Sequence, residues 1–177
     1  MILFLTFIAF LSTFLLIKIF LPYFNKYLLD KPNNRSLHKI PIPKSGGIFF
    51  ALTSSIFLYF MNNPIGIICL PLSFIGALDD KLNISRIIRY LSQLVSVTVI
   101  YLLGNGFFQS FQLDNHILQV LLISLIVFFG TAIINFTNFM DGLDGLIAGT
   151  MIVWFTAISI SWNSSYIILV GSLIGFI

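Results

Sequence analysis

Long apolar runs separated by short polar segments dominate the pattern of this 177-residue chain. A helix needs about 20 apolar residues to cross the hydrocarbon core of a bilayer, and several runs reach or approach that length. Asn62-Asn63-Pro64 is a turn signal between two shorter runs, which predicts a helical hairpin. The pattern predicts an all-α, polytopic membrane helix bundle with about six full transmembrane helices and the start of a seventh. The expected spans are residues 2–21, 47–60, 65–78, 87–103, 117–134, 146–160 and 166–177.

Composition supports the same class of protein. Hydrophobic residues make up 58% of the chain and charged residues 8%, whereas roughly a quarter of the residues in a soluble domain are charged. We expect residues 1–177 to form a single transmembrane domain, with polar loops at about 25–46, 79–86 and 135–145. A helix over residues 166–177 would cover only about 18 Å of a core about 30 Å thick. The sequence is therefore expected to be the N-terminal part of a longer protein.

The basic residues predict the orientation of the chain. All nine Lys and Arg residues fall in the first and third connecting segments or at the adjoining span ends. The positive-inside rule then places the odd-numbered loops in the cytoplasm and the N-terminus outside. The candidate polar residues that this orientation brings to one cytoplasmic face are His38, Asp79, Asp80, Asp141 and Asp144.

Asp79 and Asp80 close the third predicted span. Adjacent carboxylates can bind a divalent cation through oxygen, or one of them can accept a proton. A solvated helix terminus is the simpler interpretation. An acidic pair beside a membrane span is costly, however, and this cost favours a functional role.

The segment 135–145 concentrates amides, carboxylates and glycines between two apolar runs. Asp141 and Asp144 are each followed by Gly, which allows a close backbone approach or a positive φ. A helix that begins near Leu146 would direct its N–H groups toward an anion. Asp144 could instead cap that helix, and Asn135 and Asn138 could satisfy backbone groups or bind a ligand.

The first loop is basic and stiffened by proline. Residues 35–47 contain two prolines and end in Gly46-Gly47 at the start of a span. Cations near the headgroups suit phosphate ligands, and Arg binds them bidentately. An ordinary positive-inside loop would explain these charges, but it explains the prolines and glycines less well. Basic loops and acidic clusters on one face together predict metal-assisted phosphate chemistry.

These segments resemble the motifs of a known family, the polyprenyl-phosphate N-acetylhexosamine-1-phosphate transferases. This is glycosyltransferase family 4, which includes the phospho-N-acetylmuramoyl-pentapeptide transferases. Its members carry an R-x-x-H-x-x-P-x-P-[RK]-x-G-G loop, then G-x-x-D-D, then N-x-x-N-x-x-D-G-L-D-G. The resemblance covers essentially the whole chain but only the N-terminal half of a family member. The matching residues are Arg35, His38, Pro41, Pro43, Lys44, Gly46 and Gly47, then Gly76, Asp79 and Asp80, then Asn135, Asn138, Asp141, Gly142, Leu143, Asp144 and Gly145.

The resemblance implies a multi-pass enzyme of the bacterial cytoplasmic membrane. Such enzymes transfer a sugar-1-phosphate from a UDP-sugar to undecaprenyl phosphate, with Mg²⁺ (Mn²⁺ as a substitute) and release of UMP. The form of the first loop is more similar to the branch that initiates O-antigen and wall polymers. The implied partners are a UDP-sugar, a polyprenyl phosphate lipid and a second copy in a homodimer, with no nucleic acid. The implied roles are catalysis for Asp79 and Asp80, substrate binding for Asn138, Asp141, Asp144, Lys44 and His38, and metal binding for Asp80 and Asp141.

Two other functions remain open at this point. The first is a truncated, catalytically incomplete membrane protein or a transporter-like subunit without transferase activity, because family members carry a further metal-binding Asp in a segment expected beyond Ile177. Transporters usually place acidic residues near the bilayer midplane, whereas these lie at span ends. The second is a lipid-headgroup phosphotransferase of the CDP-alcohol type. That family requires an Arg after its Asp-Gly pair, and none follows Asp141-Gly142 here.

Overall fold

The chain is a bundle of helices, as the apolar pattern predicts. The computed structural model describes residues 1–30, 40–44, 46–82, 84–103, 113–140 and 145–177. Within these ranges the protein forms seven α-helices, one short 3₁₀ helix and one pair of two-residue strands. The elements are α1 (Ile2–Tyr27), β1 (Leu29–Asp30), β2 (Ile42–Pro43), α2 (Gly47–Phe60), α3 (Ile65–Leu82), α4 (Arg86–Leu103), α5 (His116–Met140), α6 (Leu146–Ser161), η2 (Ser164–Tyr166) and α7 (Ile167–Phe176).

The helices differ in how far they could reach across a bilayer. Ile2–Tyr27, Arg86–Leu103 and His116–Asn138 are long and apolar enough to cross a membrane. Gly47–Phe60, Leu146–Ser161 and Ser164–Phe176 are shorter apolar helices. Short helices can be accommodated where the bilayer is thinned or where they pack within protein. The membrane helix bundle is thus confirmed as a class, and the number of six full spans stays a prediction.

The centre of the described core is α7, which packs most extensively against α1. Ile168 and Leu173 of α7 are buried. A Cβ atom added at Gly171 would meet the carbonyl oxygen of Thr6, and one added at Gly175 would meet that of Phe10. Glycines at such positions let two membrane helices approach closely. The last apolar run therefore forms part of the core of this fold.

Small polar side chains join the neighbouring helices of the same cluster. The hydroxyl groups of Thr13 in α1 and Thr53 in α2 form a buried hydrogen bond of 2.6 Å. Gly66 of α3 lies so close to Ser55 of α2 that an added Cβ would stand 2.6 Å from the Cα of Ser55. Hydroxyl groups and small residues are the usual means by which membrane helices associate. The expected hairpin of residues 47–60 and 65–78 is confirmed by this α2–α3 contact.

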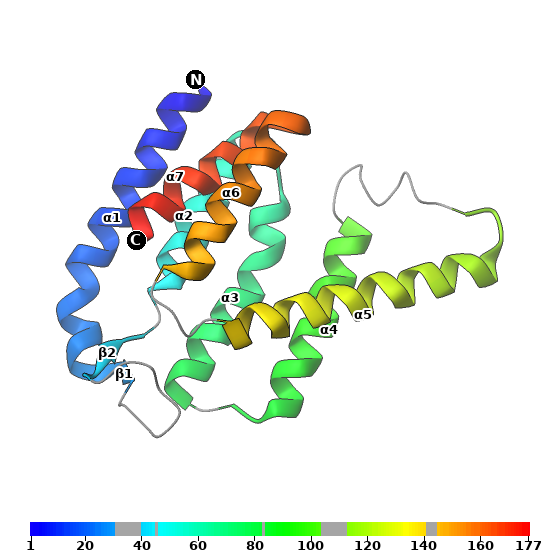
Figure 1. Ribbon diagram of the computed structural model, residues 1–177, viewed down its shortest axis with the longest axis horizontal. Coiled ribbons are helices and arrows are strands. Elements are labelled where there is room, and N and C mark those ends of the chain that lie inside the picture. Colours follow the sequence, from blue (N-terminus) through cyan, green and yellow to red (C-terminus); the bar gives the residue numbers. More distant parts are fainter. Residues whose placement is uncertain (31–39, 45, 83, 104–112, 141–144) are drawn as a thin grey trace.

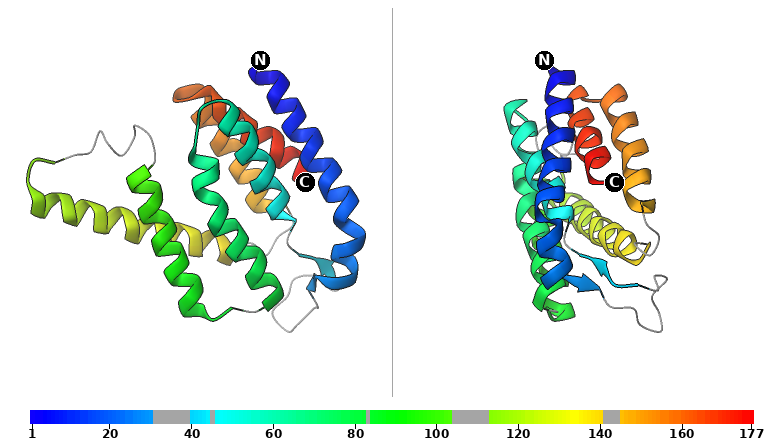
Figure 2. Two further views of the ribbon diagram at one scale, coloured as in Figure 1. Left: turned by 180° about the vertical axis from the view of Figure 1, so that it is seen from behind. Right: turned by 90° about the vertical axis from the view of Figure 1, so that its left-hand side faces the viewer.

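Helices α3, α4 and α5 continue the bundle away from the α1–α7 core. Each packs on the next, and α4 contacts both α3 and α5. Figures 1 and 2 show α5 crossing the other helices at a steep angle, with much of its length away from the core. At the α4–α5 crossing, a Cβ added at Gly130 would stand 2.7 Å from Cγ1 of Val97.

The connecting segments separate into two ends of the bundle. The side-chain amide of Asn63 donates to the hydroxyl of Ser165 at 3.1 Å, which joins the α2–α3 turn to the α6–α7 turn. In Figure 1 these turns lie at the end that holds the N-terminus, and β1, β2 and the α3–α4 connection lie at the other end. Basic residues such as Lys26, Lys81 and Arg86 belong to that other end. Its location in the cytoplasm stays a prediction of the positive-inside rule.

A two-residue antiparallel ladder, absent from the expected all-helical pattern, closes the first loop. Leu29 pairs with Pro43 and Asp30 with Ile42. Ile42 precedes a proline, which disfavours a helical conformation and favours an extended one. The backbone N–H of Lys44 then donates to the carbonyl of Leu28 at 2.8 Å. The prolines of the loop thus have a structural role beside the end of α1.

Candidate active site

Asp79 and Asp80 lie in the last turn of α3, which continues to Leu82, beyond the predicted span end at residue 78. The side chain of Asp79 is 21% exposed, and Asp80 is exposed. A carboxylate at a helix C-terminus faces the negative end of the helix dipole. The pair therefore does not stabilise its own helix, which weakens the interpretation as an ordinary solvated terminus.

Arg89 of α4 holds the first of these carboxylates. Its Nη1 donates to Oδ2 of Asp79 at 2.9 Å. The hydroxyl of Ser85 accepts a hydrogen bond from the N–H of Ile88 at 3.4 Å, which places the first turn of α4. An ion pair this exposed stabilises the fold by only about 0.2–1 kcal/mol. Its main consequence is geometric, because it fixes the orientation of Asp79 beside the exposed Asp80.

In the sequence, Arg89 stands out only as one of the basic residues that predict the topology. The signal that could have singled it out is its spacing: Arg89 follows Asp79 by ten residues. In a hairpin of two helices with a short connection, residues that far apart face each other across the turn. Lys81 and Arg86 share the same connection, so composition alone could not distinguish Arg89.

Asn135 and Asn138 lie in the last two turns of α5, because this helix runs to Met140. The expected loop over residues 135–145 is therefore wrong for its first residues. The Nδ2 group of Asn135 donates to Oε1 of Gln93 at 2.8 Å and to the carbonyl of Thr131 at 2.9 Å. Both bonds of this amide are thus made within the protein. The bond to the Thr131 carbonyl matches one of the two roles expected for Asn135, that of satisfying a backbone group, and the bond to Gln93 was not expected.

Asn138 is exposed near the end of α5. Among the described contacts, it forms no hydrogen bond with Asp79, Asp80 or Lys44. Both α3 and α5 pack on α4, so α4 is the element that relates Asn138 to the carboxylate pair. Lys44 is half-buried directly after β2 and is fixed through its backbone to the end of α1.

His38, Asp141 and Asp144 were expected to bind substrate, and they lie outside the described residues. The helix that follows them begins at Leu146, as expected, and its N-cap residue is Gly145. The alternative role of Asp144, as a cap of that helix, lies outside the described residues and stays a prediction. Gly145 has a left-handed φ of 73°, which glycine adopts without steric cost. This conformation is one of the two uses expected for the glycines of the segment.

The carboxylate pair of α3 suits Mg²⁺ in the chemistry of its donors. Mg²⁺ usually keeps several waters and binds one or two carboxylates together with substrate phosphates. In the part of the chain that the structure describes, no group of three His, Cys, Asp or Glu side chains forms a complete metal site. Asp80 could supply one oxygen ligand at the exposed end of α3, with further ligands from elsewhere.

The structure is a helical membrane bundle with two acidic residues at the end of one helix. Comparisons with known proteins identify its family. Residues 63–177 match the family model described as glycosyl transferase family 4. This match covers more than half of the chain, and the chain belongs to that family. Its relatives are transferases, so the resemblance found in the three motifs is confirmed.

Curated relatives carry related names. The undecaprenyl-phosphate alpha-N-acetylglucosaminyl 1-phosphate transferase of Escherichia coli O157:H7 is 35% identical over 163 residues, which cover 84% of this chain and 44% of that protein. The probable undecaprenyl-phosphate N-acetylglucosaminyl 1-phosphate transferase of Bacillus subtilis (strain 168) is 27% identical, over 94% of this chain and 51% of its own. The phospho-N-acetylmuramoyl-pentapeptide-transferase of Clostridium acetobutylicum is 28% identical, over 96% of this chain and 64% of that protein. The chain spans about half the length of the curated relatives it matches.

Proposed function

We propose that this chain provides part of the active site of a phosphoglycosyl transferase. The enzyme transfers an N-acetylhexosamine-1-phosphate from a UDP-sugar to undecaprenyl phosphate at the cytoplasmic face of the bacterial membrane. The observation that carries the proposal is the Asp79–Asp80 pair at the C-terminal end of α3, with Asp79 oriented by Arg89. The names of the relatives support the acceptor and the transferred group. The product would initiate a cell-envelope polysaccharide such as an O-antigen or a wall polymer.

The reaction requires an oxygen of the lipid phosphate to attack the phosphorus next to the sugar. A new P–O bond forms there, and the bond to the UMP oxygen breaks, so that UMP leaves. A carboxylate near the lipid headgroup can accept the proton of a protonated lipid phosphate and can position the attacking oxygen. Asp79 and Asp80 stand at the end of a helix that reaches the polar side of the bundle, where such a headgroup would lie.

The other residues expected at the site would bind the donor. Lys44 and His38 belong to the basic first loop and suit the phosphates of the nucleotide. Asn138, Asp141 and Asp144 suit its sugar and base edges, which offer donors to amide and carboxylate oxygens. Mg²⁺, when bound, would neutralise charge on the diphosphate of the donor. Asp80 and Asp141 are the residues of this chain that would hold it.

Membranes from cells that express the natural reading frame containing residues 1–177 provide the test. They are supplied with undecaprenyl phosphate and a UDP-N-acetylhexosamine labelled in the sugar, and the label extracted with the lipid is measured. We expect transfer that depends on a divalent cation and falls at least about 100-fold in Asp80→Asn, because a charged group at the reacting phosphates is lost. Asp114→Asn is the matched control, since Asp114 is exposed and precedes the first residue of α5. The N-terminal end of α5 lies far from α3 in Figure 1.

Two outcomes would contradict the proposal. The first is a folded protein that transfers no labelled sugar from any UDP-N-acetylhexosamine, which would favour a non-catalytic or transporter-like role. The second is activity that survives both Asp79→Asn and Asp80→Asn unchanged, which would remove the carboxylate pair from the reaction.

A further inference from the structure

A buried amide lies at the centre of the contact between α4 and α5. Gln93 is only 2% exposed although it lies in an apolar helix. A buried amide is costly unless it is hydrogen-bonded, and its Oε1 accepts a hydrogen bond of 2.8 Å from Nδ2 of Asn135. This bond joins α4 to α5 across the crossing where Gly130 packs on Val97.

The direction of this hydrogen bond is fixed by a third group. Nδ2 of Asn135 also donates to the backbone carbonyl of Thr131 at 2.9 Å. A backbone carbonyl can only accept, so the nitrogen of Asn135 must face it, and Gln93 must present its oxygen. The assignment of both amides therefore follows from the network. Together the three groups form a directed link, the Gln93–Asn135 clamp.

The clamp lies between the two halves of the proposed site. Gln93 follows Arg89, which holds Asp79, by about one helical turn on α4. Asn135 precedes Asn138 by about one turn on α5. Helix α4 thus makes one contact to the acidic end of α3 and, one turn further, one contact to the end of α5.

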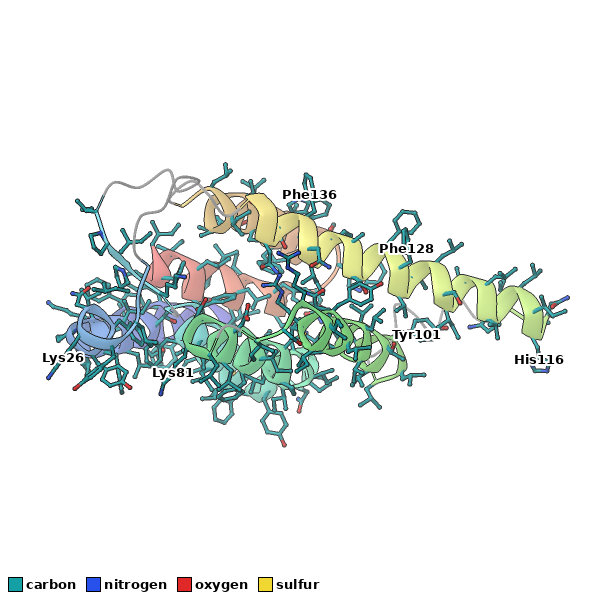
Figure 3. All side chains as sticks on the ribbon, turned by 90° about the horizontal axis from the view of Figure 1, so that it is seen from below. Lys26, Lys81, Tyr101, His116, Phe128 and Phe136 are labelled. Carbon is teal, nitrogen blue, oxygen red and sulfur yellow. The ribbon has the colours of Figure 1, made fainter. Side chains whose placement is uncertain are left out.

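Beside the clamp, the described contacts of α5 with α4 include the Gly130–Val97 packing and a hydrogen bond of 2.7 Å from Nε2 of Gln119 to the hydroxyl of Tyr101 at the other end of the crossing. Only 6% of the membrane-spanning window of α5 is buried. Phe128 and Phe136 point away from α4 in Figure 3, and each is 62% exposed. Because apolar packing holds α5 on one side only, these two interhelical hydrogen bonds help to set its rotation and register against α4, and the clamp is the one of the two that lies near Arg89 and the end of α5.

We propose that Gln93 is a positioning residue for the transferase site. It acts through Asn135 and sets the end of α5, with Asn138, at a fixed place relative to Asp79 and Asp80. The inference rests on the proposed function, because it assigns the donor to the end of α5 and the lipid phosphate to the end of α3. Loss of the clamp should then leave the binding of each substrate intact and impair their alignment.

The test measures kcat and KM for both substrates in the natural reading frame, purified in detergent. In Gln93→Leu the bond cannot form, and in Gln93→Asn the amide is kept but is too short. The double variant Gln93→Asn with Asn135→Gln restores the combined length of the two amides. Thr98→Val is the control, because the Thr98 hydroxyl bonds within α4, to the carbonyl of Leu94, at 2.8 Å. Thermal unfolding of each variant shows the temperature range in which it is folded.

We expect kcat to fall about 10- to 100-fold in Gln93→Asn, the cost of a misplacement of about 1 Å. Both KM values should stay within about twofold of the unsubstituted protein, at a temperature where the variant is fully folded. Gln93→Leu should behave alike, the double variant should recover most of kcat, and Thr98→Val should lose less than about twofold.

Unchanged kcat in Gln93→Asn and Gln93→Leu would overturn the inference, as would a loss that appears in KM alone. If Gln93→Leu does not fold, the folded Gln93→Asn variant and its double variant decide, and failure of the double variant to recover activity also counts against the inference. These outcomes require an active unsubstituted enzyme. An inactive unsubstituted enzyme would instead refute the proposed function.

Discussion

The guanidinium of Arg89 and the carboxylate of Asp79 meet at 2.9 Å across the hairpin of α3 and α4. Both side chains are partly exposed, with 43% of Arg89 and 21% of Asp79 accessible. The pair is too exposed to contribute much to stability. It does give Asp79 a fixed orientation, while the next residue, Asp80, stays exposed at the end of the helix. The orientation of Asp79 is thus fixed by an ion pair across the hairpin, beside a neighbouring carboxylate that is more exposed.

Removal of this guanidinium should impair transfer more than folding. In Arg89→Met we expect kcat to fall about 100-fold, because Asp79 loses its orientation. Arg89→Lys should recover only part of the activity, since an ammonium lacks the planar geometry of a guanidinium. The unfolding midpoint should change little. Arg86→Met removes a charge from the same helix end and should keep most of the activity, and equal losses in the two variants would contradict a specific role for Arg89.

The α1–α7 contact should not tolerate a methyl group. In Gly175→Ala the new Cβ would meet the carbonyl oxygen of Phe10. We expect a loss of about 1–3 kcal/mol in the free energy of unfolding, as for other overpacked contacts. Unfolding in mixed detergent micelles, followed by circular dichroism, measures this loss.

The control for this substitution lies in α6. An added Cβ at Gly149 meets nothing within 4 Å. Gly149→Ala should therefore stabilise the helix by about 0.5–1 kcal/mol, because alanine loses less backbone entropy on folding. Equal effects of the two substitutions would show that α1 and α7 are not in close contact.

The turn into α6 should require a residue that accepts a left-handed conformation. Gly145 has a φ of 73°, and a Cβ at such an angle costs about 1–2 kcal/mol. Gly145→Ala should lower the free energy of unfolding by about that amount, while Gly145→Asn should cost less, because Asn enters this region more readily. Thermal unfolding of the two variants checks this order, and a smaller loss for Ala than for Asn would be incompatible with the observed turn.

Opposite ends of the bundle should be accessible from opposite sides of the membrane. In a Cys69→Ser background, we expect Ser164→Cys to react with an impermeant maleimide added from outside. Lys26→Cys should react only after the membrane is permeabilised, because the positive-inside rule places this end in the cytoplasm. The reverse pattern of labelling would show that the chain is inserted the other way.

Apolar length predicted most of the fold. Residues 47–60 were expected as one span, and α2 has these bounds. The pattern failed where a polar side chain finds a partner on another helix. The fifth span was expected to end at residue 134, yet α5 continues to Met140, and Gln93 accepts a hydrogen bond from the amide of Asn135 within it. Such a bond depends on two residues that are distant in sequence, which no periodicity can reveal.

In the candidate site, too, the sequence pattern predicted the positions of residues along the helices but not their contacts with other helices. The positions of Asp79 and Asp80 at a helix end followed from the apolar run before them. The partner of Asp79 did not, since Arg89 could be distinguished from the neighbouring basic residues only by its place across the hairpin. The β1–β2 ladder also escaped prediction, because its pairing depends on where α1 ends.

In the proposed reaction a phosphate is transferred together with the sugar, and the fate of labelled phosphorus tests this transfer most directly. Membranes from cells that express the natural reading frame are given undecaprenyl phosphate and a UDP-N-acetylhexosamine. In one sample the phosphate next to the sugar carries ³²P, and in the other the phosphate next to the uridine carries it. We predict that the label next to the sugar enters the lipid fraction and that the label next to the uridine is released as UMP. Both labels should stay with the nucleotide in Asp80→Asn. Release of both labels together as UDP, with only the sugar reaching the lipid, would contradict the account.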